Sequence, residues 1–322
     1  MSSPTIEPAM SRRRLLQTMG GVAALGVLGP FAFARTAEAA SNGFGLRITD
    51  HAVHGRLHYY RFSTNNIAWN PAVNVLLPED YFHTSWRRYP VMYLLHGGLQ
   101  DFRKFHLEDD VIGLTRGRRL IVVMPDGGPA GWYSNPVSTN TGPRNWESFH
   151  IGQLLPWIDA NFRTYAEYNG RAVSGFSMGG FGALKYAAKY YGHFASVSSH
   201  SGPASLRRDA GAVVHWANAS SSVAELGGGT VYGAPFWDQA RVSADNPCER
   251  IPSYHNKRIF LACGLGDDIN ETPVRAGQRE FRALLRGSNI PHEWFELPGT
   301  HFVRRSMLQR DVDGVIARLR KA

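Results

Sequence analysis

The chain has 322 residues, of which 43% are hydrophobic and 19% charged, with 34 glycines and 18 prolines. This composition is typical of a globular protein and excludes a disordered chain, a collagen and a coiled coil. The net charge of +9 would suit a nucleic-acid-binding protein, but the basic residues are scattered along the chain and form no long block, so we expect no nucleic-acid partner.

The first 39 residues have the pattern of an export signal. Arginines at 12–14 precede an apolar, glycine-rich run over residues 20–34, and Ala37-Glu38-Ala39 is a small-x-small cleavage site. These features predict a signal peptide of twin-arginine type over residues 1–39. The apolar run, at about 15 residues, is shorter than the roughly 20 that span a bilayer. We therefore expect a secreted protein that begins near Ala40 and keeps no membrane span.

Residues 40–322 are expected to form one domain in which strands alternate with helices. Two runs of alternating polarity, Leu57–Ser63 and Ala72–Leu77, predict strands at a half-exposed antiparallel edge. Continuous apolar runs, typical of strands buried on both faces of a parallel sheet, follow at 91–95, 120–124, 172–173, 194–197 and 259–262, with a further strand at 294–297. Apolar residues at helical spacing predict helices over 147–162, 178–190, 272–285 and 304–319. This alternation predicts an α/β fold with a mostly parallel sheet and helices on both faces.

Residues 201–257 show no clear period and are too long for a simple connection. We expect them to form an insertion over one end of the sheet. The two cysteines of the chain, Cys248 and Cys263, lie in and just beyond this segment. Cys263 closes an apolar run, which favours a buried thiol, although a disulfide formed after export stays open.

A Gly-x-Ser-x-Gly turn is the strongest chemical signal in the sequence. It reads Gly175-Phe176-Ser177-Met178-Gly179, follows a predicted strand and opens a predicted helix, which is the context that this motif requires. The glycines allow a strained turn that presents the Ser177 hydroxyl to a substrate. Ser177 is therefore the predicted nucleophile.

A serine nucleophile needs a histidine base and an orienting carboxylate, in the chain order Ser, acid, His. His301 lies in a turn between a predicted strand and the last helix and is the predicted base, with His200 as the alternative. For the acid we favour Asp267, in the turn that follows the strand at 259–262, with Asp268 and Glu271 as alternatives.

A glycine-containing loop after the strand at 91–95 completes the predicted site. Its backbone N–H at Gly98, together with that of Met178, is expected to hold the oxyanion of a tetrahedral intermediate. We interpret His96, in the same loop, as structural because it precedes the nucleophile. Candidate pocket residues are Leu99, Trp132, Tyr133, Trp216 and Trp237, although burial in the core is the more common position for such aromatic side chains. No histidine pair with metal-ligand spacing occurs, and we expect no metal or other cofactor.

Several segments occur together in a fixed order: Met124-Pro125-Asp126-Gly127-Gly128 with Trp132-Tyr133-Ser134, then Trp146-Glu147-Ser148-Phe149, the serine turn, and Gly299-Thr300-His301. With these segments, the chain from about Val91 to its C-terminus resembles the esterase D and antigen 85 mycolyltransferase group of α/β hydrolases. The resemblance implies an α/β-hydrolase fold of about eight strands, a triad on Ser177, Asp267 and His301, and an insertion that shapes an acyl pocket. It also implies a small-molecule, lipid or carbohydrate ester as substrate.

Two departures from antigen 85 favour ester hydrolysis over mycolyl transfer. The first oxyanion loop has Leu99 where the resemblance would imply a trehalose-binding arginine. The antigen 85 acid would fall near Asn270 or Glu271, whereas the turn before Asp267 is more similar to esterase D and the feruloyl esterases. We therefore predict a secreted serine esterase that works through an acyl-enzyme. The alternatives are an exported acyltransferase and a non-catalytic exported binding protein.

Overall fold

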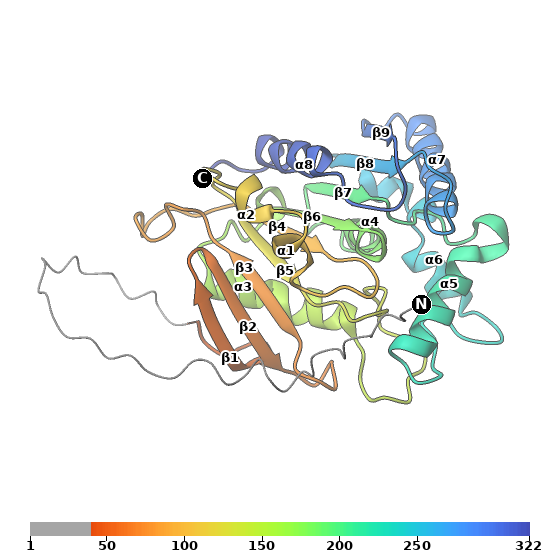
Figure 1. The fold of residues 1–322 in the computed structure, drawn as a ribbon, viewed down its shortest axis with the longest axis horizontal. Helices are drawn as coiled ribbons and strands as arrows, with labels where there is room; N and C mark the ends of the chain where they lie inside the picture. The colour runs from red at the N-terminus through yellow and green to blue at the C-terminus, as the bar shows by residue number, and fades with distance from the viewer. Residues whose placement is uncertain (1–39) are drawn as a thin grey trace, which may run out of the picture. The chain divides into compact units, whose positions relative to one another are not determined.

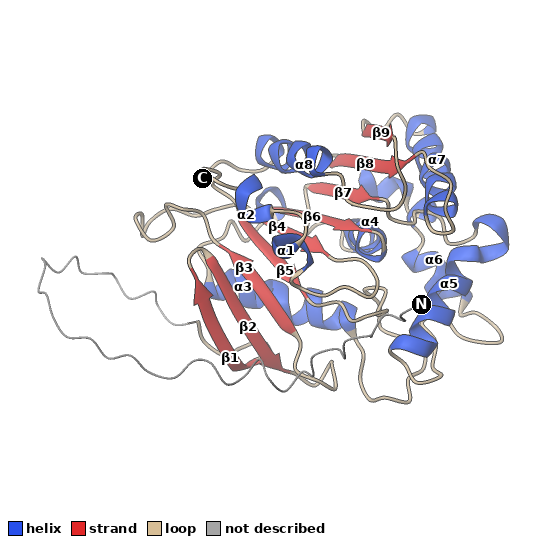
Figure 2. Cartoon of the chain, viewed as in Figure 1, coloured by secondary structure: helices blue, strands red, loops and turns tan. Residues whose placement is uncertain are grey.

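The computed structural model describes residues 40–322. The signal peptide predicted over residues 1–39 lies outside the described residues. The described residues form one compact unit built on a nine-stranded sheet. Figure 1 and Figure 2 show this sheet with helices on both of its faces. Within residues 40–322, no helix is both long and apolar enough to cross a membrane.

The strands are β1 (Arg47–His54), β2 (Leu57–Ser63), β3 (Ala72–Leu76), β4 (Val91–Leu95), β5 (Ile121–Pro125), β6 (Arg171–Phe176), β7 (Ser196–His200), β8 (Arg258–Gly264) and β9 (Glu293–Leu297). Their order in the sheet is β1-β2-β3-β5-β4-β6-β7-β8-β9. The first three strands run antiparallel to their neighbours, and all other pairs are parallel. The predicted α/β-hydrolase fold is confirmed.

The sheet has one strand more than the eight that the sequence predicts. The additional strand, β1, lies at the edge and is exposed along most of its length. Strand prediction relies on apolar residues repeating on a buried face, and β1 buries too little to show that pattern.

The helices are α1 (Lys104–Leu107), α2 (Val111–Leu114), the π-helical turn η1 (Ser148–Leu154), α3 (Leu155–Asn161), η2 (Tyr168–Gly170), α4 (Met178–Lys189), α5 (Arg208–Ala224), α6 (Gln239–Asp245), η3 (Pro247–Glu249), η4 (Ile251–Tyr254), α7 (Glu271–Gly287) and α8 (Arg305–Arg318). Helices α3, α4, α5 and α7 contribute to the core on one face of the sheet, and α1, α2 and α8 to the core on the other.

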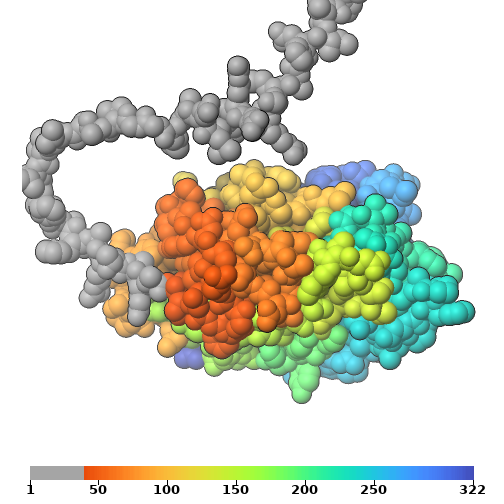
Figure 3. All heavy atoms as spheres, turned by 90° about the horizontal axis from the view of Figure 1, so that it is seen from below, coloured from red at the N-terminus to blue at the C-terminus, as the bar shows by residue number. Residues whose placement is uncertain are grey.

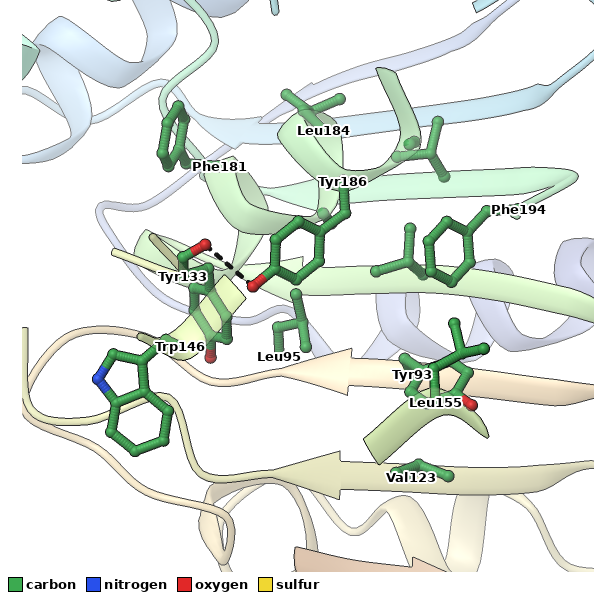
Figure 4. Close-up of a cluster of buried hydrophobic side chains, with 14 of the residues drawn as sticks. Tyr93, Leu95, Val123, Tyr133, Trp146, Leu155, Phe181, Leu184, Tyr186 and Phe194 are labelled. Atoms are coloured by element: carbon green, nitrogen blue, oxygen red, sulfur yellow. Dashed lines mark hydrogen bonds between the residues drawn. The ribbon is translucent and has the colours of Figure 1, made fainter. Parts of the chain in front are cut away.

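Large aromatic side chains fill the first of these cores. Figure 4 shows Tyr93 and Val123 on neighbouring strands beneath Leu155 and Tyr186, which come from the covering helices. The Tyr186 hydroxyl donates a hydrogen bond of 2.9 Å to the carbonyl of Tyr133. Because this core excludes water, the strand ends that carry the candidate site are held on a rigid support.

Residues 201–257 contain α5, α6, η3 and η4. In Figure 3 this blue-green segment and the red-orange N-terminal strands occupy opposite ends of the visible face. The sequence shows no clear period here because small residues, such as Ala217 and Ser221, occupy buried positions of α5. Three left-handed residues, Asp209–Gly211, also interrupt the start of that helix.

Candidate active site

Ser177 lies in the sharp turn between β6 and α4. Its backbone has φ 54° and ψ −120°, a strained conformation for a residue with a side chain. A Cβ atom at Gly175 would overlap the carbonyl oxygen of Gly179, and one at Gly179 would overlap the carbonyl oxygen of Leu95. The turn therefore requires the glycines of the motif, and it holds the serine in the strained geometry that the motif predicts.

His301 lies in the loop between β9 and α8 and reaches Ser177 across 124 residues of sequence. Its Nε2 atom is 2.7 Å from the Ser177 Oγ atom, and its Nδ1 atom is 2.6 Å from an oxygen of Glu271. The structure thus brings the predicted nucleophile and the predicted base together. The alternative base, His200, is buried and contacts the Asp311 carboxylate at 3.2 Å instead of the Ser177 hydroxyl.

The carboxylate beside His301 belongs to Glu271, the first residue of α7. Its side chain is fully buried, and its second oxygen accepts hydrogen bonds from the Ser201 hydroxyl, at 2.8 Å, and from the Gly264 N–H. These donors fix the carboxylate and leave the oxygen that faces His301 free for the imidazole N–H. Such a geometry holds the ring in one tautomer and orientation.

The prediction that Asp267 contacts His301 is wrong. The Asp267 side chain is 85% exposed and pairs with Arg275 at 2.7 Å, because the turn that carries it faces solvent. The other alternative, Asp268, accepts hydrogen bonds from the backbone N–H groups of Asn270, Glu271 and His301. Burial opposes ionisation of Asp268, but these donors outweigh it and lower the pKa of its carboxyl group. Asp268 therefore closes the turn, and Glu271 makes the contact that we expected of Asp267.

The residues that carry the two predicted oxyanion donors, Gly98 and Met178, line the same cavity. Among residues 40–322, neither the Gly98 N–H nor the Met178 N–H has a hydrogen-bond acceptor. The Met178 N–H belongs to the first turn of α4, where N–H groups have no partner within the helix and the helix dipole favours negative charge. Both donors are therefore available to an anionic oxygen near Ser177.

His96 supports the loop that carries Gly98. The Gly127 N–H donates to the His96 Nε2 atom at 2.8 Å, so the ring carries its proton on Nδ1, which faces the carbonyl of Gly97 at 2.7 Å. The ring has no contact with the Ser177 hydroxyl. Its position agrees with the structural role that the sequence suggested.

A cavity of about 480 Å³ opens above the Ser177 hydroxyl. It is lined by Gly98, Leu99, Gln100, Pro129, Ala130, Trp132, Phe176, Ser177, Met178, Trp216, Ala219, Ser220, Val223, Ala224, Asn270 and His301. Its volume is that of a small-molecule site. Most of the lining side chains are apolar, and one wall is formed by α5.

The structure places three of the five predicted pocket residues in this lining: Leu99, Trp132 and Trp216. Tyr133 lies instead in the core, with its hydroxyl donating to the His96 carbonyl at 2.9 Å. Trp237 packs edge-on against His215, with the ring centres 4.9 Å apart. The prediction that these two residues line the pocket is wrong, because Tyr133 turns inward beneath the cavity and Trp237 packs beside the start of α5.

The rest of the α5 wall could not be predicted, because its small residues have no sequence feature that distinguishes a pocket lining from a core. Both cysteines are free thiols, Cys263 buried and Cys248 half-buried. Within the part of the chain that the structure describes, no group of three or more His, Cys, Asp or Glu side chains is arranged to hold a metal ion.

Comparison with known proteins identifies the family. Residues 64–305 match the family described as "Putative esterase". Esterase Rv1288 of Mycobacterium tuberculosis (strain ATCC 25618 / H37Rv) is 68% identical over 295 residues, which cover 88% of this chain and 64% of the relative. The chain therefore spans less than two thirds of the length of that relative.

Two further relatives are more distant. Diacylglycerol acyltransferase/mycolyltransferase Ag85B of Mycolicibacterium smegmatis is 30% identical over 187 residues, 54% of this chain and 56% of the relative. The structure of an S-formylglutathione hydrolase from Agrobacterium tumefaciens matches with a TM-score of 0.68 at 17% identity, over 85% of this chain and 99% of the other. Together with the family match, the similarity to Ag85B confirms the resemblance to an esterase and antigen 85-like group, and the match to the hydrolase structure shows a shared fold. The chain belongs to this esterase family, and its fold is that of the α/β hydrolases.

Proposed function

We propose that this protein is a serine esterase that cleaves carboxylic esters through an acyl-enzyme on Ser177. The observation that carries the proposal is the pair of contacts on His301: Nε2 at 2.7 Å from the Ser177 hydroxyl and Nδ1 at 2.6 Å from Glu271. An imidazole held in this way can take a proton from the hydroxyl while the carboxylate stabilises the imidazolium that forms.

In the first half of the reaction, Ser177 Oγ attacks the ester carbonyl carbon as its proton passes to His301 Nε2. The carbonyl oxygen becomes an oxyanion, for which the N–H groups of Gly98 and Met178 are the donors. When the tetrahedral intermediate collapses, the alcohol leaves with the proton from His301, and the acyl group stays on Ser177. A water molecule, deprotonated by His301, then releases the acid by the same steps.

The cavity indicates where the alcohol part and the acyl part of the ester would bind. The alcohol must leave beside His301, because this residue returns the proton. The acyl group then extends toward the apolar surface formed by Trp132 and Trp216, whose rings meet edge-on with centres 5.2 Å apart. Since the lining contains no Lys, Arg, Asp or Glu, we infer that the ester is uncharged near the reacting bond.

Acyl transfer to an alcohol is the second candidate, and the relative named as an acyltransferase favours it. The same residues would serve, with an acceptor alcohol in place of water. We favour hydrolysis because Leu99, 82% exposed at the mouth of the cavity, offers no hydrogen bond to a sugar. Product analysis of acyl ester reactions with and without glycerol or trehalose separates the two reactions.

We also propose that the protein is exported. The support is the sequence of residues 1–39, with its paired arginines, apolar run and small-x-small site. The experiment is to express the full chain with and without Arg12→Lys and Arg13→Lys in a bacterium with a twin-arginine pathway. Loss of the protein from the exported fraction is the expected result, and unchanged export would contradict this part of the proposal.

The direct test of the proposed activity is covalent labelling. A fluorophosphonate should form an adduct on Ser177 of the folded protein, and a panel of p-nitrophenyl and feruloyl esters should be hydrolysed by the same preparation. The absence of an adduct would exclude the enzyme mechanism and leave a binding protein on the same fold.

A further inference from the structure

Glu225 is a buried carboxylate that the proposed mechanism does not use. It is the residue that follows the last turn of α5, and it is only 5% exposed. One carboxylate oxygen accepts a hydrogen bond of 2.9 Å from the Ala130 N–H, and the other accepts one from the indole N–H of Trp146. Within residues 40–322, no Lys, Arg or His side chain lies within ion-pair distance of Glu225. A buried carboxylate without a cationic partner is costly and calls for an explanation.

The segment that Glu225 holds is the loop 127–132, which follows β5. Gly128 passes so close to Glu225 that a Cβ atom there would overlap both carboxylate oxygens. Two hydroxyl groups of α5 hold the same loop: Ser221 donates to the carbonyl of Ala130, and Ser220 accepts the indole N–H of Trp132 at 2.9 Å. The end of α5 is thus joined to this loop by three side chains.

The loop 127–132 contributes to both halves of the candidate site. Pro129, Ala130 and Trp132 line the cavity. The carbonyl of Pro129 also accepts a hydrogen bond of 2.7 Å from the N–H of Leu99, the residue that follows Gly98. The position of the loop therefore fixes both the cavity wall and the direction of the neighbouring Gly98 N–H.

We propose that Glu225, in its ionised form, is a positioning residue that holds the loop 127–132 and through it the Gly98 N–H and the acyl side of the cavity. This inference rests on the proposed esterase function. A carboxylate has only acceptors, so both of its oxygens can face N–H donors. Protonation of Glu225, or its replacement by glutamine, would turn a donor toward an N–H group and weaken one of the two contacts.

The surroundings make this ionisation sensitive to pH near neutrality. Burial raises the pKa of Glu225 to about 7, although the hydrogen bonds from Trp146 and Ala130 lower it. The charged groups that act on it are Asp126, which also raises the pKa, and Arg144, which lowers it; the Tyr133 hydroxyl is the other titratable group affected by Glu225.

The direction of this pKa shift predicts that ionisation of Glu225 has opposite effects on activity and on stability. Because the pKa in the folded protein lies above the ordinary value of 4.5, the stability associated with the group is present below about pH 4.5 and is lost as the pH rises toward 7. The ionised form, which makes both contacts, is therefore the less stable one. We expect Glu225→Gln to keep a Tm close to that of the wild type at pH 8 while it loses activity.

The experiment compares the full-length wild type with Glu225→Gln, Glu225→Asp and a control, Glu167→Gln. Glu167 is exposed and pairs only with Arg320, at 2.7 Å. For each protein, active sites are titrated with a fluorophosphonate, Tm is measured, and kcat and KM are determined for p-nitrophenyl acetate and octanoate between pH 5.5 and 9. These measurements separate the number of folded sites from the rate per site.

We expect kcat per titrated site to fall about 10- to 100-fold in Glu225→Gln at pH 8, with a smaller change in KM for acetate, because a displaced oxyanion donor acts on the transition state. The fall of kcat/KM as the pH is lowered from 9 to 5.5 should be steeper in the wild type than in Glu225→Gln, because only the wild type has a carboxyl group at this position that takes up a proton. Glu225→Asp, which keeps the charge, should recover part of the rate, and Glu167→Gln should match the wild type.

Two results would overturn the inference. One is a wild-type rate per site and an unchanged low-pH slope in Glu225→Gln. The other is a loss of activity matched by a fall in Tm or in the number of titrated sites, since Glu225 would then support folding alone. Failure of the proposed function is distinguishable, because it appears in the wild type as absence of labelling or of ester hydrolysis.

Discussion

Two clusters in this molecule combine serine hydroxyls, a histidine and a buried carboxylate. In the first, which we call the site cluster (Ser177, His301 and Glu271), the histidine lies between the other two groups. In the second, which we call the α8 cluster, the carboxylate of Asp311 lies in the middle. It accepts hydrogen bonds from Ser174, Ser198, His200 and Arg258.

The order of contacts separates the two clusters chemically. In the site cluster, one ring nitrogen of His301 faces the Ser177 hydroxyl and the other faces the Glu271 carboxylate. The imidazole can therefore accept the hydroxyl proton, and the carboxylate balances the positive charge that the imidazole then carries. In the α8 cluster, the hydroxyls of Ser174 and Ser198 donate directly to Asp311. A hydroxyl that donates to a carboxylate in this way is not activated by an imidazole. The same kinds of residue thus form the proposed nucleophile and its base in one place and a structural crosslink in the other.

The α8 cluster supports the site cluster. Asp311 ties α8 to three neighbouring strands, β6, β7 and β8. Helix α8 begins four residues after His301, and the carbonyl of His200 accepts the N–H of Ser177 at 2.9 Å. The buried crosslink therefore stabilises the packing of α8 and β7, the elements next to the His301 loop and the Ser177 turn, while its hydrogen bonds reach neither of these two side chains.

The largest expected effect is that of Ser177→Ala, which tests whether the site cluster provides the nucleophile. This variant removes one hydroxyl and leaves the α8 cluster intact. Hydrolysis of p-nitrophenyl esters should fall by about 10⁴- to 10⁶-fold, because the variant loses the hydroxyl that lies 2.7 Å from His301 Nε2. Initial rates and fluorophosphonate labelling measure this loss, with Tm as the control for folding. Residual hydrolysis near the wild-type rate would show that another nucleophile does the chemistry.

A second variant pair tests which acid belongs to the site cluster. Glu271→Gln should lower kcat about 10³- to 10⁴-fold, because the amide no longer holds His301 in the tautomer that accepts the serine proton. The matched control is Asp267→Asn, which removes an exposed ion pair with Arg275 and should change kcat less than about threefold. The opposite ranking of the two variants would return the role to Asp267.

A third variant tests the structural role of the α8 cluster. Asp311→Asn should lower the free energy of unfolding by about 3 to 5 kcal/mol at pH 7, because Arg258 and the buried hydroxyls lose a fully buried acceptor. Chemical denaturation measures this loss. The rate per titrated active site should stay near that of the wild type. A large fall in that rate with unchanged stability would contradict the comparison.

The pH dependence of this third effect has a definite sign. Burial opposes ionisation of Asp311, but hydrogen bonding by His200 and the charge of Arg258 outweigh it and lower the pKa of the carboxyl far below its ordinary value of 3.8. Its stabilising contribution is therefore present above about pH 4 and is lost as the pH falls below that value. The stability difference between the wild type and Asp311→Asn should shrink in acid, as denaturation curves between pH 7 and 3 would show.

The smallest expected effect concerns the cavity beside the site cluster. Trp216→Ala should shift the preference for acyl esters toward longer chains by about tenfold in relative kcat/KM, because it removes an aromatic side chain from the α5 wall. Trp237→Ala is the matched control, since this residue lies outside the cavity lining and should not change the ranking of substrates. Equal shifts in the two variants would mean that the acyl group binds elsewhere.

A feature of the site could be predicted from the sequence when it depends on residues that are close together in the chain. The turn at Ser177 depends on glycines within two residues of the serine, and its flanking strand and helix carry their own apolar patterns. The identity of the acid, in contrast, depends on which position of the loop turns toward His301. Asp267, Asp268 and Glu271 lie within five positions, and each suits a polar turn. No local property of the sequence states which carboxylate points inward.

Sequence patterns alone predicted eight of the nine strands, the helices that cover 147–162, 178–190, 272–285 and 304–319, the strained serine turn and the glycine loop at Gly98, because periodicity and steric demand act over a few neighbouring residues. The identity of the acid and the lining of the cavity became clear only from the tertiary structure. Helix α7 begins at Glu271 and buries that carboxylate beneath His301, while the preceding turn leaves Asp267 in solvent. The packing of α5 against the loop 127–132 likewise selected Trp216 for the cavity and excluded Trp237. These choices depend on contacts between segments far apart in the chain, which are fixed only when the whole sheet and its covering helices are packed.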